Sequence, residues 1–332
     1  MERVTIIGTG LIGGSIGLGL KASQLPGVEV VGYDDSSSAL ATARKQGAID
    51  ISARSIGDAV DGARMVIIAT PALAARSILQ DIAGRLAEGA IVTDTLSTKA
   101  EIMHWAREYL PDNVSYVGGH PMAGKATSAG AAESEATLFH GRSYCIVPSP
   151  DASDGAVQSV VGLANLLGAQ PVFMHAEEHD QYVAAISHLP MMVSYALFSL
   201  ARESAAWQDM RLLASTGFAG ATRLASGDPQ MTHDICVTNG EALIHWIDRF
   251  IEELRRYRGM IADDPGELFK ALAGAQLKRD AFLAGADKPE REQMDLPSAS
   301  EQMSTILFGG FLTSRYQEYE KRMRESEERN RR

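Results

Sequence analysis

A glycine-rich turn stands directly behind an apolar run near the start of the chain, and it constrains the fold more than any other feature. Residues 4–7 have the composition of a buried strand, and Gly8, Gly10 and Gly13 follow them in a Gly-x-Gly-x-x-Gly pattern. In such a turn the first glycine permits the tight bend, the second lets a pyrophosphate approach the backbone, and the third lets a helix pack on the strand. The pattern predicts a dinucleotide site at a helix N-terminus.

Asp34 supports this interpretation and indicates which dinucleotide binds. It follows a second apolar run, residues 28–33, about 20 residues beyond the glycines, where a carboxylate accepts hydrogen bonds from the adenosine ribose. A carboxylate at this position repels a 2′-phosphate, and no arginine follows in the next four residues, so NAD is favoured over NADP. The alternative is that the glycines only mark a turn and that Asp34 caps the next helix.

The chain divides into two parts of different character. Residues 1–175 alternate apolar runs with helical stretches, which predicts an α/β Rossmann domain with a doubly wound, mostly parallel sheet. Residues 176–316 show only helical periodicity and predict an all-α second domain. The charged stretch 317–332 predicts a helix end or a tail. The seven strand candidates are residues 4–7, 28–33, 65–69, 90–94, 114–118, 144–148 and 171–174.

Composition argues against several classes of partner. The 332-residue chain has a formal net charge of -11, which gives little electrostatic reason to bind nucleic acid or an anionic membrane. We expect no membrane span, no export signal and therefore a soluble cytoplasmic protein. Cys145 and Cys236 lie far apart in sequence, and His233 near Cys236 leaves too few ligands for a metal, so we expect no metal site.

Polar residues gather where predicted strands end, and that is where open sheets bind their ligands. Residues 94–99 (Asp-Thr-Leu-Ser-Thr-Lys) follow one strand, and residues 118–124, with His120 at their centre, follow the next. A third polar group, His179-Asp180 and the Ser-His-Leu-Pro run at 187–190, opens the helical half. A Rossmann domain alone does not name a reaction, so these segments must carry the chemistry.

Together these motifs make the chain similar to the prephenate and arogenate dehydrogenase family of tyrosine biosynthesis. The similarity covers nearly the whole chain, and it includes a Thr-Arg pair at 222–223 ahead of Asp-Pro at 228–229. It implies that residues of the Gly-Leu-Ile-Gly-Gly-Ser and Ala-Thr-Pro segments contact NAD alongside the three glycines and Asp34, namely Leu11, Ile12, Thr70 and Pro71.

The resemblance also implies a reaction on a small-molecule substrate. The family oxidises a cyclohexadienol at its C4 hydroxyl, passing hydride to the nicotinamide while the ring carboxylate leaves as carbon dioxide. This chemistry needs a base, a hydroxyl partner and a cation for the carboxylates. His120, Ser97 and Arg223 match the family's positions for these roles, with Ser97 hydrogen-bonded to the substrate or to His120 and also near the cofactor; His188 is a further substrate contact.

Each assignment has a structural alternative. His120 could simply terminate a strand before its proline, and Ser97 could cap a helix with Glu101 beyond it. Arg223 could be an exposed helix charge, and His188 could be a buried linker between the domains. His179 and Asp180 could cap the helix that starts near His188, and Lys99 is expected to be structural or a neighbour of the cofactor.

Substrate choice and assembly stay open at this point. Several prephenate-selective relatives carry a second histidine after Ser-His-Leu-Pro, whereas this chain has Met191, which resembles members acting on arogenate or on both substrates. We expect a homodimer formed by the apolar helical half, as in the resembled family. The alternatives are an imine reductase or 3-hydroxyacid dehydrogenase with the same two-domain plan, or a non-catalytic NAD-binding dimeric sensor.

Overall fold

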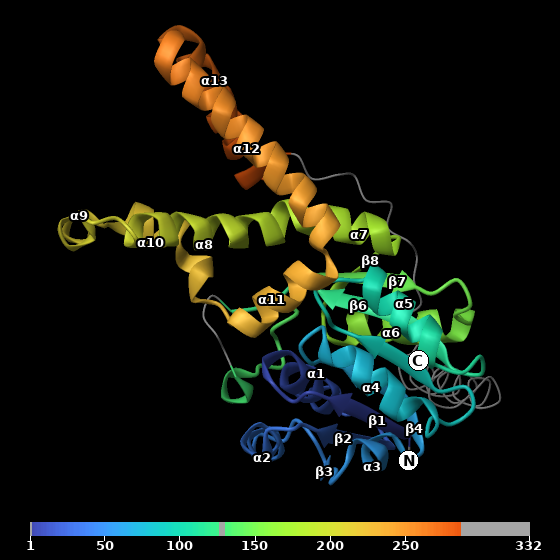
Figure 1. Ribbon diagram of the computed structural model, residues 1–332. Coiled ribbons are helices and arrows are strands. Elements are labelled where there is room, and N and C mark those ends of the chain that lie inside the picture. The colour runs from blue at the N-terminus through green and yellow to red at the C-terminus, as the bar shows by residue number, and fades with distance from the viewer. Residues whose placement is uncertain (1, 126–129, 287–332) are drawn as a thin grey trace, which may run out of the picture.

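The computed structural model describes residues 2–125 and 130–286 (Figure 1). The predicted tail at 317–332 and the end of the predicted helical domain lie outside the described residues. The first half is an eight-stranded sheet in the order β3-β2-β1-β4-β5-β6-β7-β8. Its strands are β1 (Glu2–Ile7), β2 (Val28–Tyr33), β3 (Ile51–Ser52), β4 (Ala63–Ile68), β5 (Ile91–Asp94), β6 (Ser115–Pro121), β7 (Ser143–Pro148) and β8 (Gln170–Phe173).

All pairings in the sheet are parallel except that of β6 with β7. The order reverses beside β1, which has β2 on one side and β4 on the other. This is the doubly wound, mostly parallel arrangement predicted from the sequence, and each of the seven strand candidates coincides with an observed strand. The missed strand, β3, has two exposed residues, too few to show any periodicity.

Two layers of helices bury the two faces of the sheet. Ile6 and Ile67 face one hydrophobic cluster, whereas the neighbouring Ile7 and Ile68 face the other, as the alternation of side chains along a strand requires. The first cluster packs under α1 (Leu11–Ala22), α2 (Ser37–Lys45) and α6 (Asp154–Leu166), and the second under α3 (Ile56–Val60), α4 (Ala74–Ala83) and α5 (Ala100–Tyr109).

No strand follows β8 in the described part of the chain, and the second half is helical. Figure 1 shows it leaving the sheet half as two arms, one carrying α8 to α10 and the other α12 and α13. Its helices are α7 (Ala176–Val183), α8 (Leu189–Arg202), α9 (Trp207–Leu213), α10 (Thr216–Ala221), α11 (Pro229–Thr238), α12 (Gly240–Asp263) and α13 (Pro265–Leu283), with the short turns η2 (Ala184–His188) and η3 (Arg223–Ser226). A third short turn, η1 (Ala131–Glu133), belongs to the sheet half, between β6 and β7.

A π turn interrupts the first long helix of this half. Helices α7 and α8 run through η2 as one 27-residue helix. The Leu189 amide donates to the carbonyl of Ala184, five residues back, and Pro190 has no amide hydrogen with which to continue the normal ladder. The turn therefore places His188 on the inner side, where it is fully buried.

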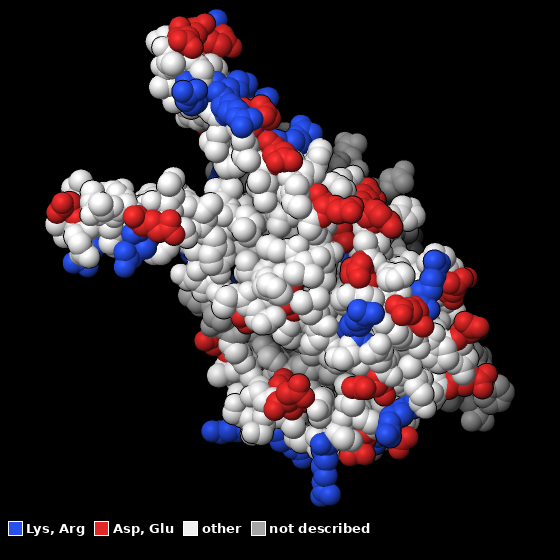
Figure 2. Space-filling view, in the orientation of Figure 1, with Lys and Arg blue, Asp and Glu red and all other residues white. Residues whose placement is uncertain are grey.

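The apolar side chains of the two arms are largely uncovered. By length and composition the helix Ala176–Arg202 could cross a membrane, although the core helix of a soluble protein passes the same test. Figure 2 shows few charged side chains along α8 and in the centre of the view. The exposed large apolar residues of α12 and α13 include Ile244, Ile251, Leu254, Ile261, Phe269, Leu272 and Leu277.

Candidate active site

The glycine turn is built as its spacing predicts. Gly8 has φ +91, and a Cβ there would lie 2.4 Å from the Ala69 carbonyl oxygen, so only glycine fits. A Cβ on Gly13 would lie 1.9 Å from the Gly8 carbonyl oxygen, because helix α1 packs directly on the turn. A Cβ on Gly10 would meet nothing within 4 Å. The turn therefore leaves open space over Gly10, at the N-terminus of α1, where a pyrophosphate fits.

The remaining predicted cofactor contacts surround this turn. Leu11 and Ile12 form the half-buried start of α1. Thr70 is half-buried behind β4, and its Cγ2 would lie 2.9 Å from a Cβ on Gly8, while Pro71 beside it is exposed. Strands β1 and β4 are neighbours, so all four residues lie at one edge of the sheet.

Asp34 lies beside the same turn. Its Oδ2 accepts hydrogen bonds from the Thr9 amide at 2.6 Å and from the Thr9 hydroxyl at 3.1 Å, and its Oδ1 accepts from the Ser36 amide at 2.8 Å. The side chain that caps α2 is that of Ser36, which accepts from the Ala39 amide. Asp34 thus joins the glycine turn to the end of β2 and is not the helix cap considered as an alternative.

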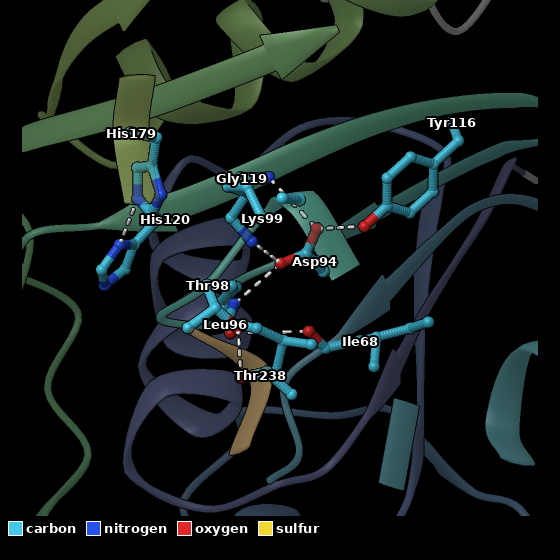
Figure 3. Close-up of polar contacts among 12 residues, drawn as sticks. Ile68, Asp94, Leu96, Thr98, Lys99, Tyr116, Gly119, His120, His179 and Thr238 are labelled. Carbon is cyan, nitrogen blue, oxygen red and sulfur yellow. Dashed lines mark hydrogen bonds and ion pairs between the residues drawn. The ribbon is translucent and has the colours of Figure 1, made fainter. Parts of the chain in front are cut away.

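His120 lies near the end of β6, and its side chain faces the helical half (Figure 3). The residue is 9% exposed. Its Nδ1 is 2.9 Å from Nε2 of His179, and Nδ1 of His179 is 2.7 Å from the Oδ1 of Asp180. The Nε2 of His120 has no hydrogen-bond partner in the described part of the chain.

Burial and neighbouring charges keep His120 neutral. Loss of hydration lowers its pKa well below the usual 6.5, and His179, Lys99 and His188 lower the pKa further by charge repulsion. A neutral imidazole whose second nitrogen is unoccupied can accept a proton. The geometry and the pKa therefore both suit a general base.

His188 occupies the inner side of the π turn. Its Nδ1 is 3.3 Å from the side-chain amide of Asn239, which also donates to the Asp180 carbonyl at 2.8 Å. Its buried Nε2 has no hydrogen-bond partner among the described residues, and burial lowers its pKa to about 4. His188 thus fits the buried-linker alternative, and its substrate contact stays a prediction.

Lys99 and Asp94 form a fully buried ion pair, and Lys99 is near enough to His120 to lower its pKa by charge repulsion. The Asp94 carboxylate also accepts hydrogen bonds from the Tyr116 hydroxyl, from the Leu96 amide at 2.8 Å and from the Gly119 amide at 3.3 Å. Such a paired and hydrogen-bonded charge fixes the backbone around it. The pair ties the loop after β5 to the strand that carries His120, so Lys99 has the structural role considered for it.

Two partners were considered for Ser97, the substrate hydroxyl and His120, and the structure does not form the hydrogen bond to His120. Ser97 is half-buried behind β5, and within the described ranges its hydroxyl makes no hydrogen bond. The nitrogen of His120 that faces the protein is taken by His179. Ser97 is not a helix cap either, because Asp180 accepts from the first amides of α5, those of Lys99 and Ala100, both at 2.8 Å.

Arg223 lies at the start of η3, which packs on α8, and its side chain is exposed. It is not among the charged groups that shift the pKa of His120. The structure therefore brings His120 and His188 into one cluster, places Ser97 behind the neighbouring strand, and leaves the role of Arg223 as a prediction.

Sequence reasoning missed the arrangement of three residues, His179, Asp180 and Asn239. The pair His179-Asp180 stood out as a possible cap for its own helix, whereas Asp180 caps α5, about 80 residues earlier in the chain. Asn239 gave no signal at all. Only the fold reveals that the middle of α7 lies against the end of β6 and the start of α5.

Two family models match the chain: "Prephenate dehydrogenase, nucleotide-binding domain" over residues 16–173 and "Prephenate dehydrogenase, dimerization domain" over residues 175–274. The chain belongs to the prephenate dehydrogenase family. It is 34% identical to the prephenate dehydrogenase of Bacillus subtilis over 85% of this chain and 76% of that protein. It is 30% identical to the cyclohexadienyl dehydrogenase of Zymomonas mobilis over 80% of this chain and 90% of that one.

Solved structures agree with this membership. A prephenate dehydrogenase from A. aeolicus, in complex with hydroxyphenyl propionate and NAD+, has a TM-score of 0.79 at 28% identity, covering 85% of this chain and 98% of that one. Synechocystis arogenate dehydrogenase has a TM-score of 0.71 at 26% identity, covering 84% and 99%. The family resemblance, the two-part fold and the class of NAD-dependent dehydrogenase predicted from the motifs are confirmed.

Proposed function

We propose that this chain oxidatively decarboxylates prephenate or arogenate, with NAD+ as hydride acceptor, giving 4-hydroxyphenylpyruvate or tyrosine. The observation that carries the proposal is the neutral, buried imidazole of His120 with an unoccupied Nε2. It stands at the same sheet edge as the glycine turn and faces the helical half. The relatives named for prephenate, arogenate and cyclohexadienyl substrates support this reaction class.

In the proposed reaction His120 takes the proton of the C4 hydroxyl. The O–H bond breaks and an Nε2–H bond forms, while the carbon gives up its hydride to leave a carbonyl. The bond to the ring carboxylate then breaks to release carbon dioxide, its electron pair aromatises the ring, and the phenolate oxygen takes the proton back from Nε2 to give the phenol. When bound, NAD+ supplies the hydride acceptor. Buried surroundings strengthen the contacts that orient the hydroxyl towards His120, and aromatisation of the ring makes the reaction downhill.

Three further residues are proposed to hold the substrate. Ser97 follows the strand next to that of His120, and its free hydroxyl can donate to the substrate oxygen. The guanidinium of Arg223 can bind a carboxylate through two parallel hydrogen bonds. The buried Nε2 of His188 is an unsatisfied polar atom in the same cluster, and a substrate oxygen would satisfy it.

Met191 leaves both substrates possible. Its side chain is 8% exposed, and its sulfur accepts a hydrogen bond from the Thr232 hydroxyl at 3.4 Å. A thioether held in this way offers no charge to distinguish a keto side chain from an amino acid side chain. We therefore propose activity on both prephenate and arogenate.

We also propose a homodimer in the cytoplasm, without nucleic-acid or membrane partners. The match to a dimerization domain covers residues 175–274, which include α8 to α12 and the first half of α13, the helices with uncovered apolar side chains. The long apolar helix Ala176–Arg202 carries His179, Asp180, His188 and Ser194, all buried against protein groups. A second subunit suits such a helix better than lipid does.

The reaction is tested by NADH formation with prephenate, arogenate and simple hydroxy acids in turn. His120→Asn should lower kcat by about two orders of magnitude or more, with the Kd for NAD nearly unchanged. His104→Gln is the matched control, because that side chain is 68% exposed on α5. Silence of the unaltered protein with both cyclohexadienols despite bound NAD, or a near-normal kcat in His120→Asn, would overturn the proposal.

A further inference from the structure

His120, His179 and Asp180 form a chain of hydrogen bonds, and the proposed reaction uses only its outer end. Figure 3 shows the link between His120 and His179. The chain crosses from the sheet half to the helical half. His179 is fully buried and Asp180 is 4% exposed, so these two side chains act on a substrate only through the residues that they hold.

The inner end of this hydrogen-bond chain is the carboxylate of Asp180, which can only accept hydrogen bonds. Both oxygens of Asp180 accept backbone amides at the start of α5, those of Lys99 and Ala100. The N-terminus of a helix favours negative charge, and a carboxylate that accepts hydrogen bonds at both oxygens acts as an acceptor only. Asp180 therefore has no proton to offer His179.

An acceptor at one end of the chain fixes the protonation of each ring in turn. Nδ1 of His179 must carry a hydrogen to donate to Asp180, which leaves its Nε2 as an acceptor in the neutral ring. Nδ1 of His120 must then carry a hydrogen to donate to that Nε2. The remaining nitrogen of His120, Nε2, is left with a free lone pair on the side that has no protein partner.

We infer that His179 and Asp180 are positioning residues that hold His120 in the tautomer able to accept a proton at Nε2. The opposite tautomer of His179 would turn a lone pair towards the carboxylate, which is repulsive, and would block the base by placing the hydrogen of His120 on Nε2. The same carboxylate orders the start of α5, so it also restrains the loop that carries Ser97. The inference deepens the proposed function and rests on it for the kinetic test.

The kinetic test uses paired replacements of His179. In His179→Gln an amide oxygen can still accept from Nδ1 of His120, whereas the shorter His179→Asn side chain does not reach it. We expect kcat to fall about a hundredfold in His179→Asn and in Asp180→Asn, and by less in His179→Gln, with KM and the Kd for NAD within about threefold of the unaltered protein. His104→Gln again controls for loss of an exposed histidine.

The spectroscopic test does not depend on turnover. In protein labelled with 15N-histidine and saturated with NAD, protonated and unprotonated ring nitrogens resonate far apart, and His120→Asn identifies the signals of His120. We expect a protonated Nδ1 and an unprotonated Nε2 on His120. In His179→Asn and Asp180→Asn we expect this single state to be replaced by a mixture.

The two measurements separate failure of the inference from failure of the function. A hydrogen on Nε2 of His120 in the unaltered protein, or an unchanged tautomer in both Asn variants, would overturn the inference. So would equal kcat losses in His179→Gln and His179→Asn. If the unaltered protein turned over neither cyclohexadienol, the proposed function would fail, and the spectra alone would decide the role of His179 and Asp180.

Discussion

The sheet half and the helical half use their apolar residues in opposite ways. In the sheet half, clusters on both faces are buried under the chain's own helices. In the helical half most large apolar side chains of α12 and α13 are exposed within one chain, and neither buried cluster reaches those helices. The comparison teaches that the first half contains its own hydrophobic core, whereas the exposed apolar side chains of the second half need a partner surface to bury them. We propose that this partner is a second copy of the chain.

The largest expected effect tests whether the apolar face of α12 is buried in a dimer interface. Ile251 and Leu254 are 39% and 53% exposed on one face of α12, and burying such a side chain is worth about 1.5–3 kcal/mol. The double variant Ile251→Gln/Leu254→Gln should raise the dimer dissociation constant by at least about a hundredfold, because a two-fold dimer loses each contact twice. Light scattering across a concentration series measures the change.

The control for this experiment is Arg255→Gln on the same helix, whose exposed side chain pairs with Glu252 and with no other residue in the described part of the chain. That variant should leave the dimer unchanged, since exposed pairs contribute little. A monomeric unaltered protein at micromolar concentration would break the comparison, because the exposed face would then need no cover.

The next effect tests the close packing of helix α1 on the glycine turn in the sheet half. In Gly13→Ala the added Cβ would meet the Gly8 carbonyl oxygen at 1.9 Å, so helix and turn must separate. We expect a loss of about 1–3 kcal/mol in the free energy of unfolding and at least about tenfold weaker NAD binding. Gly155→Ala, where a Cβ would meet nothing within 4 Å, is the matched control. Denaturant melts and NAD titrations that did not distinguish the two would contradict the role of this glycine.

A smaller effect tests the role of Asp34 in the preference for NAD over NADP. Asp34→Ser removes the carboxylate that neighbours the glycine turn, and with it the repulsion of a 2′-phosphate. The ratio of kcat/KM with NAD to that with NADP should fall about tenfold. Asp35→Ser, one residue on and exposed, should leave the ratio unchanged.

The smallest expected effect is on the pH dependence of activity, to which residues of both halves contribute. The pKa of His120 is lowered by burial and by Lys99 from the sheet half together with His179 and His188 from the helical half. The base works in its neutral form, so activity is present above its pKa and lost as pH falls through it. We therefore expect kcat/KM to hold its plateau below pH 6.5, the usual histidine value. If kcat/KM instead fell with a midpoint at or above pH 6.5, the pKa of His120 would not be lowered by its surroundings.

The fold was largely predictable because its signals are local. The glycine spacing, the seven apolar runs and the loss of strands after β8 are all properties of neighbouring residues. Residue types at the candidate site were also predictable, since His120, Ser97 and Asp34 follow strand ends. Their partners were not: Ser97 was expected to bond the substrate hydroxyl or His120, whereas the protein partner of His120 is His179, 59 residues later. Which side chains meet across the domain junction depends on packing that sequence periodicity does not encode.

Two helices of the sheet half are capped by carboxylates of the helical half, and this limits how the protein can be truncated or joined to a relative. Asp180 caps α5, and Asp234 accepts a hydrogen bond from the Leu73 amide at the start of α4 at 3.0 Å. A fragment ending before residue 176 would leave both helix starts without their acceptors. A chimera with a relative would therefore keep its nucleotide fold intact only if the donor of the first half also supplied the segments that carry these two carboxylates.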